Sequence, residues 1–269
     1  MLRDRVLSAL VLVPIVGLAI WAGDGWFFAT IALAALLAGY EYSQLMRQGG
    51  YMPPVVSVLG IIGILLLDAQ FPSLEIVQPG VTAVLILSIS WQLFQAQDRM
   101  PATNWALAVA GGLYLGWLSA NAIRLRALLD PAGLAWTILA ILVTWGGDTA
   151  AYFIGRAIGR HKFWPRLSPG KTWEGFIAGI LGSLVTGGLV GHLAMLWVGS
   201  IGLVHGLLAG LLAGGVGPFG DLAISMMKRQ VKVKDSGNII PGHGGLLDRT
   251  DSLLFVVAIT YYYAIWFAR

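Results

Sequence analysis

Long apolar runs separated by short polar segments recur along the whole 269-residue chain. Several runs approach the roughly 20 residues that a helix needs to cross a bilayer. The pattern predicts an all-α, polytopic integral membrane protein with about nine transmembrane or membrane-embedded helices. The predicted segments are 5–22, 26–46, 55–68, 81–95, 104–120, 133–159, 173–199, 202–232 and 250–268. The third and fourth are short for full spans, so whether they cross the membrane is left open.

Composition supports this interpretation and excludes a water-soluble domain. Hydrophobic residues make up 57% of the chain and charged residues only 11%, and the mean hydropathy is +0.78. The first apolar segment resembles a signal peptide, but it has no clear small-x-small cleavage site, so we expect a retained first span. The absence of cysteine excludes disulfides and thiolate metal sites.

Basic residues are distributed unevenly between the predicted loops. If all nine segments cross the membrane, 14 of the 17 Lys and Arg residues fall on one side, which leaves Arg124, Arg126 and Arg269 on the other. The positive-inside bias then predicts a cytoplasmic N-terminus and an outer C-terminus, with the protein in the cell (inner) membrane. We expect Arg124 and Arg126 to lie in an interfacial turn.

Glycines at four-residue intervals mark the segment 202–232, where GLLAGLLAG carries Gly206, Gly210 and Gly214. This spacing lets helix backbones approach closely in lipid. We expect packing within one chain, and a dimer interface is the alternative. The stretch GVGPFG in the same segment fits a dinucleotide-binding pattern, but it lies in an apolar helix and not between a strand and a helix. We interpret it as a helix kink.

The charge that this chain does carry is concentrated at Ser225–Asp251, which holds five Lys or Arg and three Asp. Asp221 precedes this stretch, and helical spacing places it on one face with Ser225, Lys228 and Lys232. An ionisable group at membrane depth indicates a functional site. A buried Asp221–Lys228 ion pair is the structural alternative.

Asp248 and Asp251 lie at the far end of the same stretch, where the last predicted helix begins. Asp248 could act only as a helix N-cap. However, consecutive antiparallel helices can bring Asp221 and Asp248 together, and paired carboxylates beside Lys and Arg suit magnesium with a polyphosphate. A second basic loop, 156–172, ends in GKT but lacks the glycine spacing and the strand of a P-loop.

The run S-x-x-K-R-x4-K-D-x-G-x2-I-P-x-H-G-G-x2-D-R-x-D, from Ser225 to Asp251, resembles the signature of the phosphatidate cytidylyltransferases, or CDP-diacylglycerol synthases. SPGKTWEG, at 168–175, resembles the second motif of this family, with Gly170 where a lysine is expected. The resemblance implies a single membrane-embedded domain over 1–269, with the signature region at 221–251.

The resemblance also implies a reaction and a set of residues. CTP and phosphatidic acid would form CDP-diacylglycerol and pyrophosphate, dependent on Mg²⁺, at the cytoplasmic side of the membrane. A second, monovalent cation and a homodimer are left open, and no nucleic acid is expected as a partner. The implied catalytic residues are Ser225, Lys228, Arg229 and Lys234. The implied substrate-binding residues are Ser168, Lys171, Thr172, Asp235, His243 and Arg249. The implied metal ligands are Asp221 and Asp248, with Asp251 in the second shell or on a second ion.

Three alternatives stay open at this point. A cytidylyltransferase could act on another lipid phosphate or on a polyprenol-type alcohol. An ion-coupled transporter could also place acids in the membrane, but the outer halves of these segments offer no polar path. A non-catalytic scaffold would not explain Asp221 and Asp248.

Overall fold

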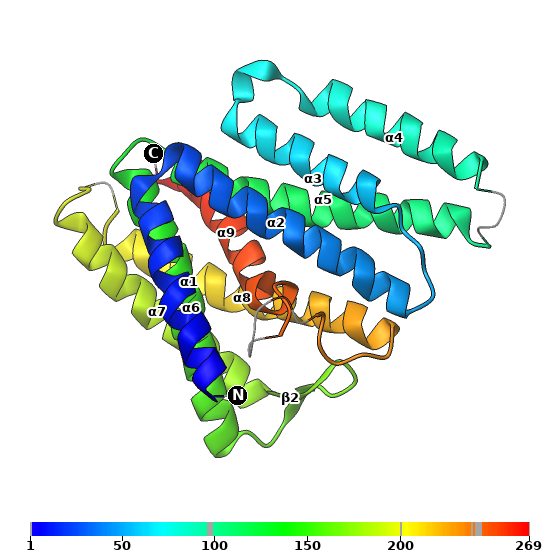
Figure 1. Cartoon of the computed structure of the whole chain (residues 1–269). Helices are drawn as coiled ribbons and strands as arrows, with labels where there is room; N and C mark the ends of the chain where they lie inside the picture. Colours follow the sequence, from blue (N-terminus) through cyan, green and yellow to red (C-terminus); the bar gives the residue numbers. More distant parts are fainter. Residues whose placement is uncertain (1, 96–98, 200, 238, 240–243, 269) are drawn as a thin grey trace. The chain divides into compact units, whose positions relative to one another are not determined.

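The computed structural model describes residues 2–95, 99–199, 201–237, 239 and 244–268. This part of the chain is almost entirely helical, as predicted (Figure 1). The α-helices are α1 (Leu2–Ala22), α2 (Asp24–Gln48), α3 (Val55–Gln70), α4 (Val77–Leu93), α5 (Pro101–Arg126), α6 (Ala132–Ile158), α7 (Trp173–Met195), α8 (Leu203–Gln230) and α9 (Leu247–Phe267). A 3₁₀ turn, η1 (Pro72–Leu74), links α3 to α4, and two short strands are β1 (Lys162–Trp164) and β2 (Ser168–Thr172).

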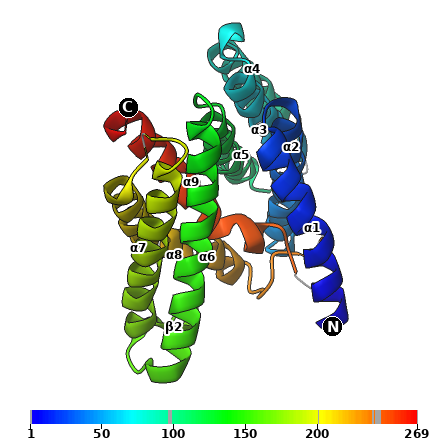
Figure 2. The same ribbon diagram turned by 90° about the vertical axis from the view of Figure 1, so that its left-hand side faces the viewer.

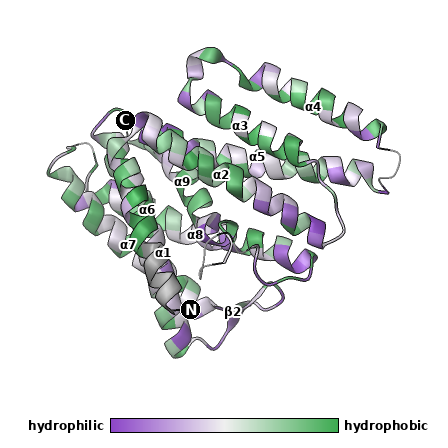
Figure 3. Ribbon diagram, viewed as in Figure 1, coloured by the Kyte–Doolittle hydropathy of each residue, from purple (hydrophilic) through white to green (hydrophobic). Residues whose placement is uncertain are grey.

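Six of the described helices are long and apolar enough to cross a membrane: α2, α5, α6, α7, α8 and α9. Shorter apolar stretches are Leu10–Ala22, Val55–Gln70 and Val77–Leu93. Hydrophobic residues are spread along α2, α3, α4, α6 and α7, and hydrophilic residues gather at the C-terminal ends of α2 and α8 (Figure 3). The prediction of an all-α, polytopic integral membrane protein is therefore confirmed.

The chain divides into two compact units, and it passes from one unit to the other near the end of α8 and again at the start of α9. The first unit comprises Met1–Arg124 and Lys228–Asp248, and the second comprises Leu125–Met227 and Arg249–Arg269. The signature region contributes residues to both units. The expectation of a single domain over 1–269 stays a prediction.

The first unit packs α2, α3 and α5 around a dry apolar core. Leu45, Ile61 and Leu65 are fully buried, and glycines on α5 bring the helices close together. A Cβ on Gly111 would lie 2.1 Å from the ring of Tyr42 on α2. The Tyr42 hydroxyl donates a hydrogen bond to the Leu107 carbonyl of α5, at 3.0 Å. The position of α2 is thus defined by both packing and a polar contact.

The second unit is built on α6 and α7, which run side by side and are joined at one end by the hairpin of β1 and β2 (Figure 2). The Ser183 hydroxyl of α7 donates to the Val143 carbonyl of α6, at 2.9 Å. The glycines of α8 meet α7 as the four-residue spacing predicts. A Cβ on Gly206 would lie 2.1 Å from the Gly187 carbonyl oxygen, and one on Gly210 would lie 2.3 Å from that of Ser183. This face of α8 is therefore packed within the chain.

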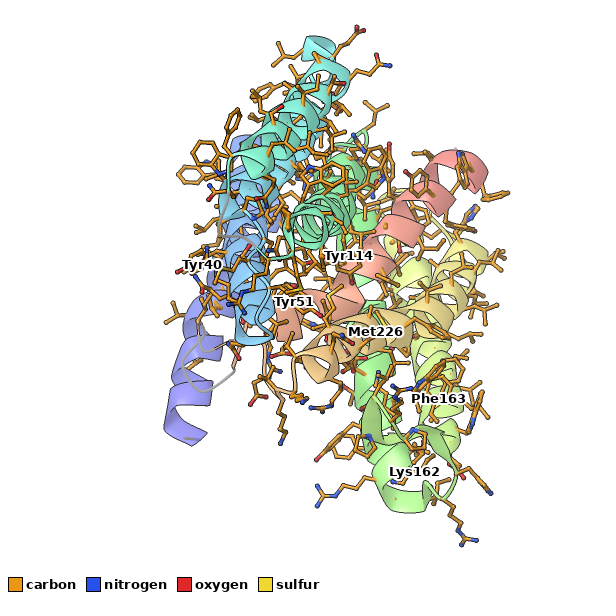
Figure 4. All side chains as sticks on the ribbon, turned by 90° about the vertical axis from the view of Figure 1, so that its right-hand side faces the viewer. Tyr40, Tyr51, Tyr114, Lys162, Phe163 and Met226 are labelled. Atoms are coloured by element: carbon orange, nitrogen blue, oxygen red, sulfur yellow. The ribbon has the colours of Figure 1, made fainter. Side chains whose placement is uncertain are left out.

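The hairpin is an addition to the predicted fold, because the sequence analysis expected only a loop between α6 and α7. The strands are antiparallel, with Lys162 opposite Thr172 and Trp164 opposite Ser168. Figure 4 shows Lys162 and Phe163 in this hairpin. The Phe163 ring stacks on Phe176 of α7, with centroids 4.7 Å apart. Aromatic packing therefore fixes the hairpin against α7, although its sequence is basic and rich in turn-forming residues.

One local prediction is corrected. Arg124 and Arg126 lie in the last turn of α5, not in an interfacial turn, and both are paired: Arg124 with Asp68 at 3.1 Å and Arg126 with Asp130 at 2.7 Å. Their charges are neutralised by carboxylates. The stretch GVGPFG lies inside α8, with Pro218 in the helix, and the kink there stays a prediction.

Candidate active site

The second unit holds a cluster of charged and polar side chains centred on Asp221, here called the Asp221 cluster and made of Asp221, Ser225 and Lys171. Asp221 and Ser225 are one turn apart on α8, and the Ser225 hydroxyl donates to Asp221 Oδ1 at 3.2 Å. The Lys171 ammonium lies 2.8 Å from Asp221 Oδ2. It also donates to the Pro218 carbonyl at 3.1 Å. A serine and a lysine therefore hold one carboxylate.

The hairpin places Lys171 in this cluster. Lys171 lies in β2, next to Thr172, which is the N-cap of α7 and accepts a hydrogen bond from the Gly175 N–H at 3.2 Å. Glu174 of α7 contacts His161, the residue before β1. Glu174 Oε1 accepts a hydrogen bond from the His161 backbone N–H at 3.2 Å and lies 2.6 Å from His161 Nδ1. The second motif thus forms a folded element that aims a lysine at α8.

Asp148 of α6 lines a small cavity in the second unit, together with Thr144, Ser183, Pro218 and small residues of α7, α8 and α9. The cavity volume is about 20 Å³, which is room for on the order of one water molecule. A nucleotide does not fit into this space.

The first unit holds the second cluster, here called the Asp248 cluster and made of Lys228, Ser236, Asp248 and Glu41. The Lys228 ammonium lies 2.5 Å from Asp248 Oδ1. Asp248 Oδ2 accepts from both the backbone N–H and the hydroxyl of Ser236, each at 2.9 Å. The side chains of Lys228 and Asp248 are only 11% and 12% exposed. In such surroundings a carboxylate needs its partners, because an unpaired buried charge is strongly unfavourable.

The end of α8 is closed by a capped turn that sets the direction of the signature loop. The Val233 N–H binds the Lys228 carbonyl and the Lys232 N–H binds the Arg229 carbonyl, as in a Schellman motif. Lys232 has a φ of +61°, a conformation usually taken by glycine at this position. Because α8 ends at Gln230, Lys232 lies in the turn and not on the helical face that the spacing predicts.

Glu41 of α2 belongs to this cluster and is not among the residues predicted from the sequence. It is buried, with 3% exposure. Its carboxylate accepts hydrogen bonds from the Ser236 hydroxyl at 2.8 Å, the Leu246 N–H at 2.7 Å and the Leu247 N–H at 3.0 Å. The available signal was an acid within an apolar helix, the argument applied to Asp221 but not to segment 26–46.

Two structural alternatives were considered for the acids, an Asp221–Lys228 ion pair and Asp248 as a helix N-cap, and the structure shows neither among the described residues. Lys228 pairs with Asp248, and Asp221 pairs with Lys171, so the expected Asp221–Lys228 pair does not form in the described structure. Asp248 lies in the first turn of α9, and its described hydrogen bonds go to Lys228 and Ser236. It is Glu41 that accepts the backbone N–H groups at the start of α9, so Glu41 performs the capping role that was considered for Asp248.

The other predicted site residues are placed less tightly. Arg229 is exposed, and its guanidinium donates to the Val233 carbonyl at 2.8 Å. Asp251 Oδ1 accepts from the Ser252 N–H at 2.7 Å. Ser168 is half-buried in β2, and Lys234, Asp235 and Arg249 are exposed. His243 lies outside the described residues.

The side chains of these clusters that could hold a metal ion are carboxylates and hydroxyls. Within the residues that the structure describes, three or more His, Asp or Glu side chains do not gather in a metal-binding group. Within each cluster the oxygen donors, from Asp221 and Ser225 in one and from Asp248 in the other, are of the hard type that Mg²⁺ prefers, and Mg²⁺ commonly binds one or two protein carboxylates together with substrate phosphates and water. The donor set therefore fits Mg²⁺ and does not fit a thiolate or imidazole metal.

Six long apolar helices and two acid–lysine clusters define a polytopic membrane protein with charged side chains in each of its two units. A family model described as "Cytidylyltransferase family" matches residues 3–267. The chain is 34% identical to a phosphatidate cytidylyltransferase of Synechocystis sp., over 97% of this chain and 96% of that protein. It is 37% identical to one of Bacillus subtilis, over 77% and 79%, and 32% identical to one of Haemophilus influenzae, over 98% of each.

The chain therefore belongs to the cytidylyltransferase family, which confirms the resemblance found at Ser225–Asp251. It is an enzyme, a nucleotidyltransferase. The transporter and scaffold alternatives have no support from these relatives.

Proposed function

We propose that this protein transfers the cytidylyl group of CTP to phosphatidic acid, forming CDP-diacylglycerol and pyrophosphate for phospholipid synthesis. The observation that carries the proposal is the near full-length similarity to phosphatidate cytidylyltransferases of distant bacteria. The two acid–lysine clusters support it, because cations and carboxylates together suit a metal-bound polyphosphate.

The chemistry requires little acid–base catalysis from the protein. A phosphate oxygen of phosphatidic acid, already anionic, attacks the α-phosphorus of CTP. The bond from this phosphorus to the β-phosphate oxygen breaks, and pyrophosphate leaves with the electron pair. Positioning and charge neutralisation are the main catalytic contributions in such phosphoryl transfers.

The lysines and arginines of both motifs would provide this neutralisation. We assign Lys228, Arg229 and Lys234 to the phosphates, with Ser168 and Lys171 closing on the nucleotide from the hairpin. In this scheme Lys171 and Lys228 exchange their carboxylate partners for phosphates of the bound CTP. Ser225, which donates to Asp221, orients that carboxylate. Thr172, Asp235, His243 and Arg249 stay assigned to substrate binding.

We further propose that Asp221 and Asp248 bind Mg²⁺, with Asp251 in the second shell or on a second ion. When bound, Mg²⁺ would neutralise phosphate charge as pyrophosphate departs. The roles of Ser225 and Ser236 are then to hold the two carboxylates in one orientation, as such outer partners do at metal sites generally. A homodimer and a monovalent cation remain additional hypotheses.

The proposed location is the inner membrane, with a cytoplasmic N-terminus and the site on the cytoplasmic side. Support comes from the 14 of 17 basic residues that a nine-span arrangement places on one side. CTP arrives from the cytoplasm in this arrangement, and the lipid enters sideways between helices.

The decisive experiment incubates purified protein with labelled CTP, phosphatidic acid and Mg²⁺ and measures labelled lipid and pyrophosphate in equal amounts. Diacylglycerol, a polyprenol and a polyprenyl phosphate replace phosphatidic acid in parallel reactions. We expect product from phosphatidic acid alone. Product only from another acceptor would change the assigned substrate, and no labelled lipid from folded protein would refute the proposal.

A further inference from the structure

The Asp248 cluster contains an acid that comes from a distant helix and does not touch Lys228. We propose that this acid, Glu41 of α2, is a positioning residue that orients Asp248 through Ser236 and through the backbone at the start of α9. The inference rests on the proposed function, in which Asp248 binds Mg²⁺.

Both carboxylate oxygens of Glu41 accept hydrogen bonds from the segment that leads into α9. Oε1 accepts from the Ser236 hydroxyl, and Oε2 accepts from the N–H groups of Leu246 and Leu247. The last two are at the N-terminus of α9, where the helix dipole and unpaired N–H groups stabilise negative charge. One buried side chain thereby ties α2 to both ends of the segment 236–247.

The hydroxyl of Ser236 is shared between two carboxylates. It lies 2.8 Å from Glu41 Oε1 and 2.9 Å from Asp248 Oδ2, but it has only one proton to donate. The Ser236 backbone N–H also binds Asp248 Oδ2, so this oxygen is held whichever way the hydroxyl proton points. Asp248 Oδ1 is then the oxygen directed at Lys228.

The glycines of the signature leave room for Glu41. A Cβ on Gly245 would lie 1.8 Å from Glu41 Oε1, and one on Gly237 would lie 2.3 Å from the same atom. Neither position can carry a side chain without displacing the carboxylate. A third close contact joins the same elements, because a Cβ on Gly49 at the end of α2 would lie 2.4 Å from Val231. Val231, Gly237 and Gly245 therefore all lie close to α2.

This arrangement determines what loss of Glu41 should do. Partners that orient a metal-binding carboxylate typically contribute about 10–100-fold in metal affinity or activity. Glu41→Gln keeps the volume but presents an amide NH₂ to groups that are themselves donors. We expect the Mg²⁺ concentration for half-maximal activity to rise about 10–100-fold, with a smaller change in KM for CTP.

A matched control is Asp68→Asn, which removes a carboxylate from the same unit that pairs with Arg124 and not with the signature loop. It should leave the Mg²⁺ midpoint unchanged. A Glu41→Gln variant that merely unfolds in part would lose maximal activity at an unchanged midpoint, and that result would overturn the proposal.

A second variant covers the case in which Glu41→Gln does not fold. Ser236→Ala removes only the shared hydroxyl, and it should shift the Mg²⁺ midpoint in the same direction. Where both single variants fold, the double variant should be less impaired than the product of the two effects, because coupled residues are not additive. An unchanged midpoint in Ser236→Ala, or full additivity, would contradict a shared action on Asp248.

A third measurement requires no turnover. The chain has no cysteine, and Leu247 is fully buried, so Leu247→Cys provides a single thiol that a maleimide reaches only when the start of α9 opens. Adding Glu41→Gln should raise the labelling rate by about tenfold or more, because hydrogen bonds to a charged group are lost. An equal rate would refute the anchoring role, even if CTP and phosphatidic acid prove not to be the substrates.

Discussion

Lys228 and Asp248 form an ion pair across twenty residues of sequence, with the ammonium 2.5 Å from Asp248 Oδ1. In the second unit, Lys171 and Asp221 form a comparable pair at 2.8 Å. Each carboxylate also accepts a serine hydroxyl, from Ser236 and Ser225 respectively. The same local arrangement therefore occurs twice, once in each unit, and most of the predictions below test it.

Asp248→Asn tests the metal role most directly. The change keeps the side-chain volume and removes one negative charge, so we expect turnover to fall by about 100-fold or more at ordinary Mg²⁺. Higher Mg²⁺ or added Mn²⁺ should restore part of it by mass action. Product formation across a Mg²⁺ titration measures this. Near wild-type activity at ordinary Mg²⁺ would contradict the metal role and leave Asp248 as the ion-pair partner of Lys228.

Lys228→Gln and Arg229→Gln should both weaken turnover, but Lys228→Gln should lower the free energy of unfolding more than Arg229→Gln. Lys228 is buried against Asp248, so its loss leaves a carboxylate without its cation and should cost about 1–3 kcal/mol of stability. Arg229 is exposed, and its loss should cost less than about 0.5 kcal/mol. Thermal unfolding in detergent, with and without Mg²⁺, measures both. Equal destabilisation would mean that the Lys228–Asp248 pair contributes little.

Lys171→Gln distinguishes a phosphate-binding lysine from a topology anchor. We expect turnover to fall by about tenfold or more, since a cation beside the phosphates is lost, while membrane orientation stays the same. Lys171→Arg should retain part of the activity because it keeps the charge. Activity assays and a reporter near Lys162 measure the two effects. Should Lys171→Gln reverse the orientation, the hairpin serves as an anchor and its assigned role falls.

Apolar run length and glycine spacing were enough to predict the helices and one packing contact. The nine segments were found in the right order, and the close approach at Gly206 and Gly210 was anticipated. The hairpin was not, because its stability comes from Phe163 packing on Phe176 of α7, a tertiary contact that strand propensity does not reveal.

The acids and bases of the site were predictable, but their partners were not. Asp221, Asp248 and Lys228 stand out as charges in an apolar chain, and Lys171 follows from the family resemblance of the second motif. Helical spacing suggested Asp221–Lys228, whereas folding pairs each acid with a lysine from another segment. Glu41 was missed because its partners, 195 to 206 residues away, are invisible to local spacing.

Gly206→Ala and Gly215→Ala form a matched pair on α8. A Cβ at Gly206 would meet the Gly187 carbonyl at 2.1 Å, whereas one at Gly215 would meet nothing within 4 Å. We expect Gly206→Ala to destabilise the monomer by about 1–3 kcal/mol and Gly215→Ala to be neutral or slightly stabilising. Thermal unfolding and light scattering in detergent measure stability and mass. If Gly206→Ala weakened a dimer and left monomer stability unchanged, this face would be an interface.

The side of the membrane on which each end of the chain lies follows from the number of helices that cross. Of the nine α-helices that the structure describes, α3 and α4 are the shortest. Helices α3 and α4 have 16 and 17 residues, which makes them about 24–26 Å long, less than the roughly 30 Å hydrocarbon core. They are consecutive, so if both fail to cross, two crossings are lost and the ends of the chain keep their sides. A reporter fused after Arg269 should therefore appear outside the cytoplasm and one near Lys162 inside, whether there are nine spans or seven. Protease protection or reporter activity in intact cells measures this. Both reporters on the same side would mean that one of the three helices between them, α7, α8 and α9, does not cross. Two reporters on the sides opposite to those expected would point to α1, whose apolar stretch is only Leu10–Ala22, and its deletion would test this.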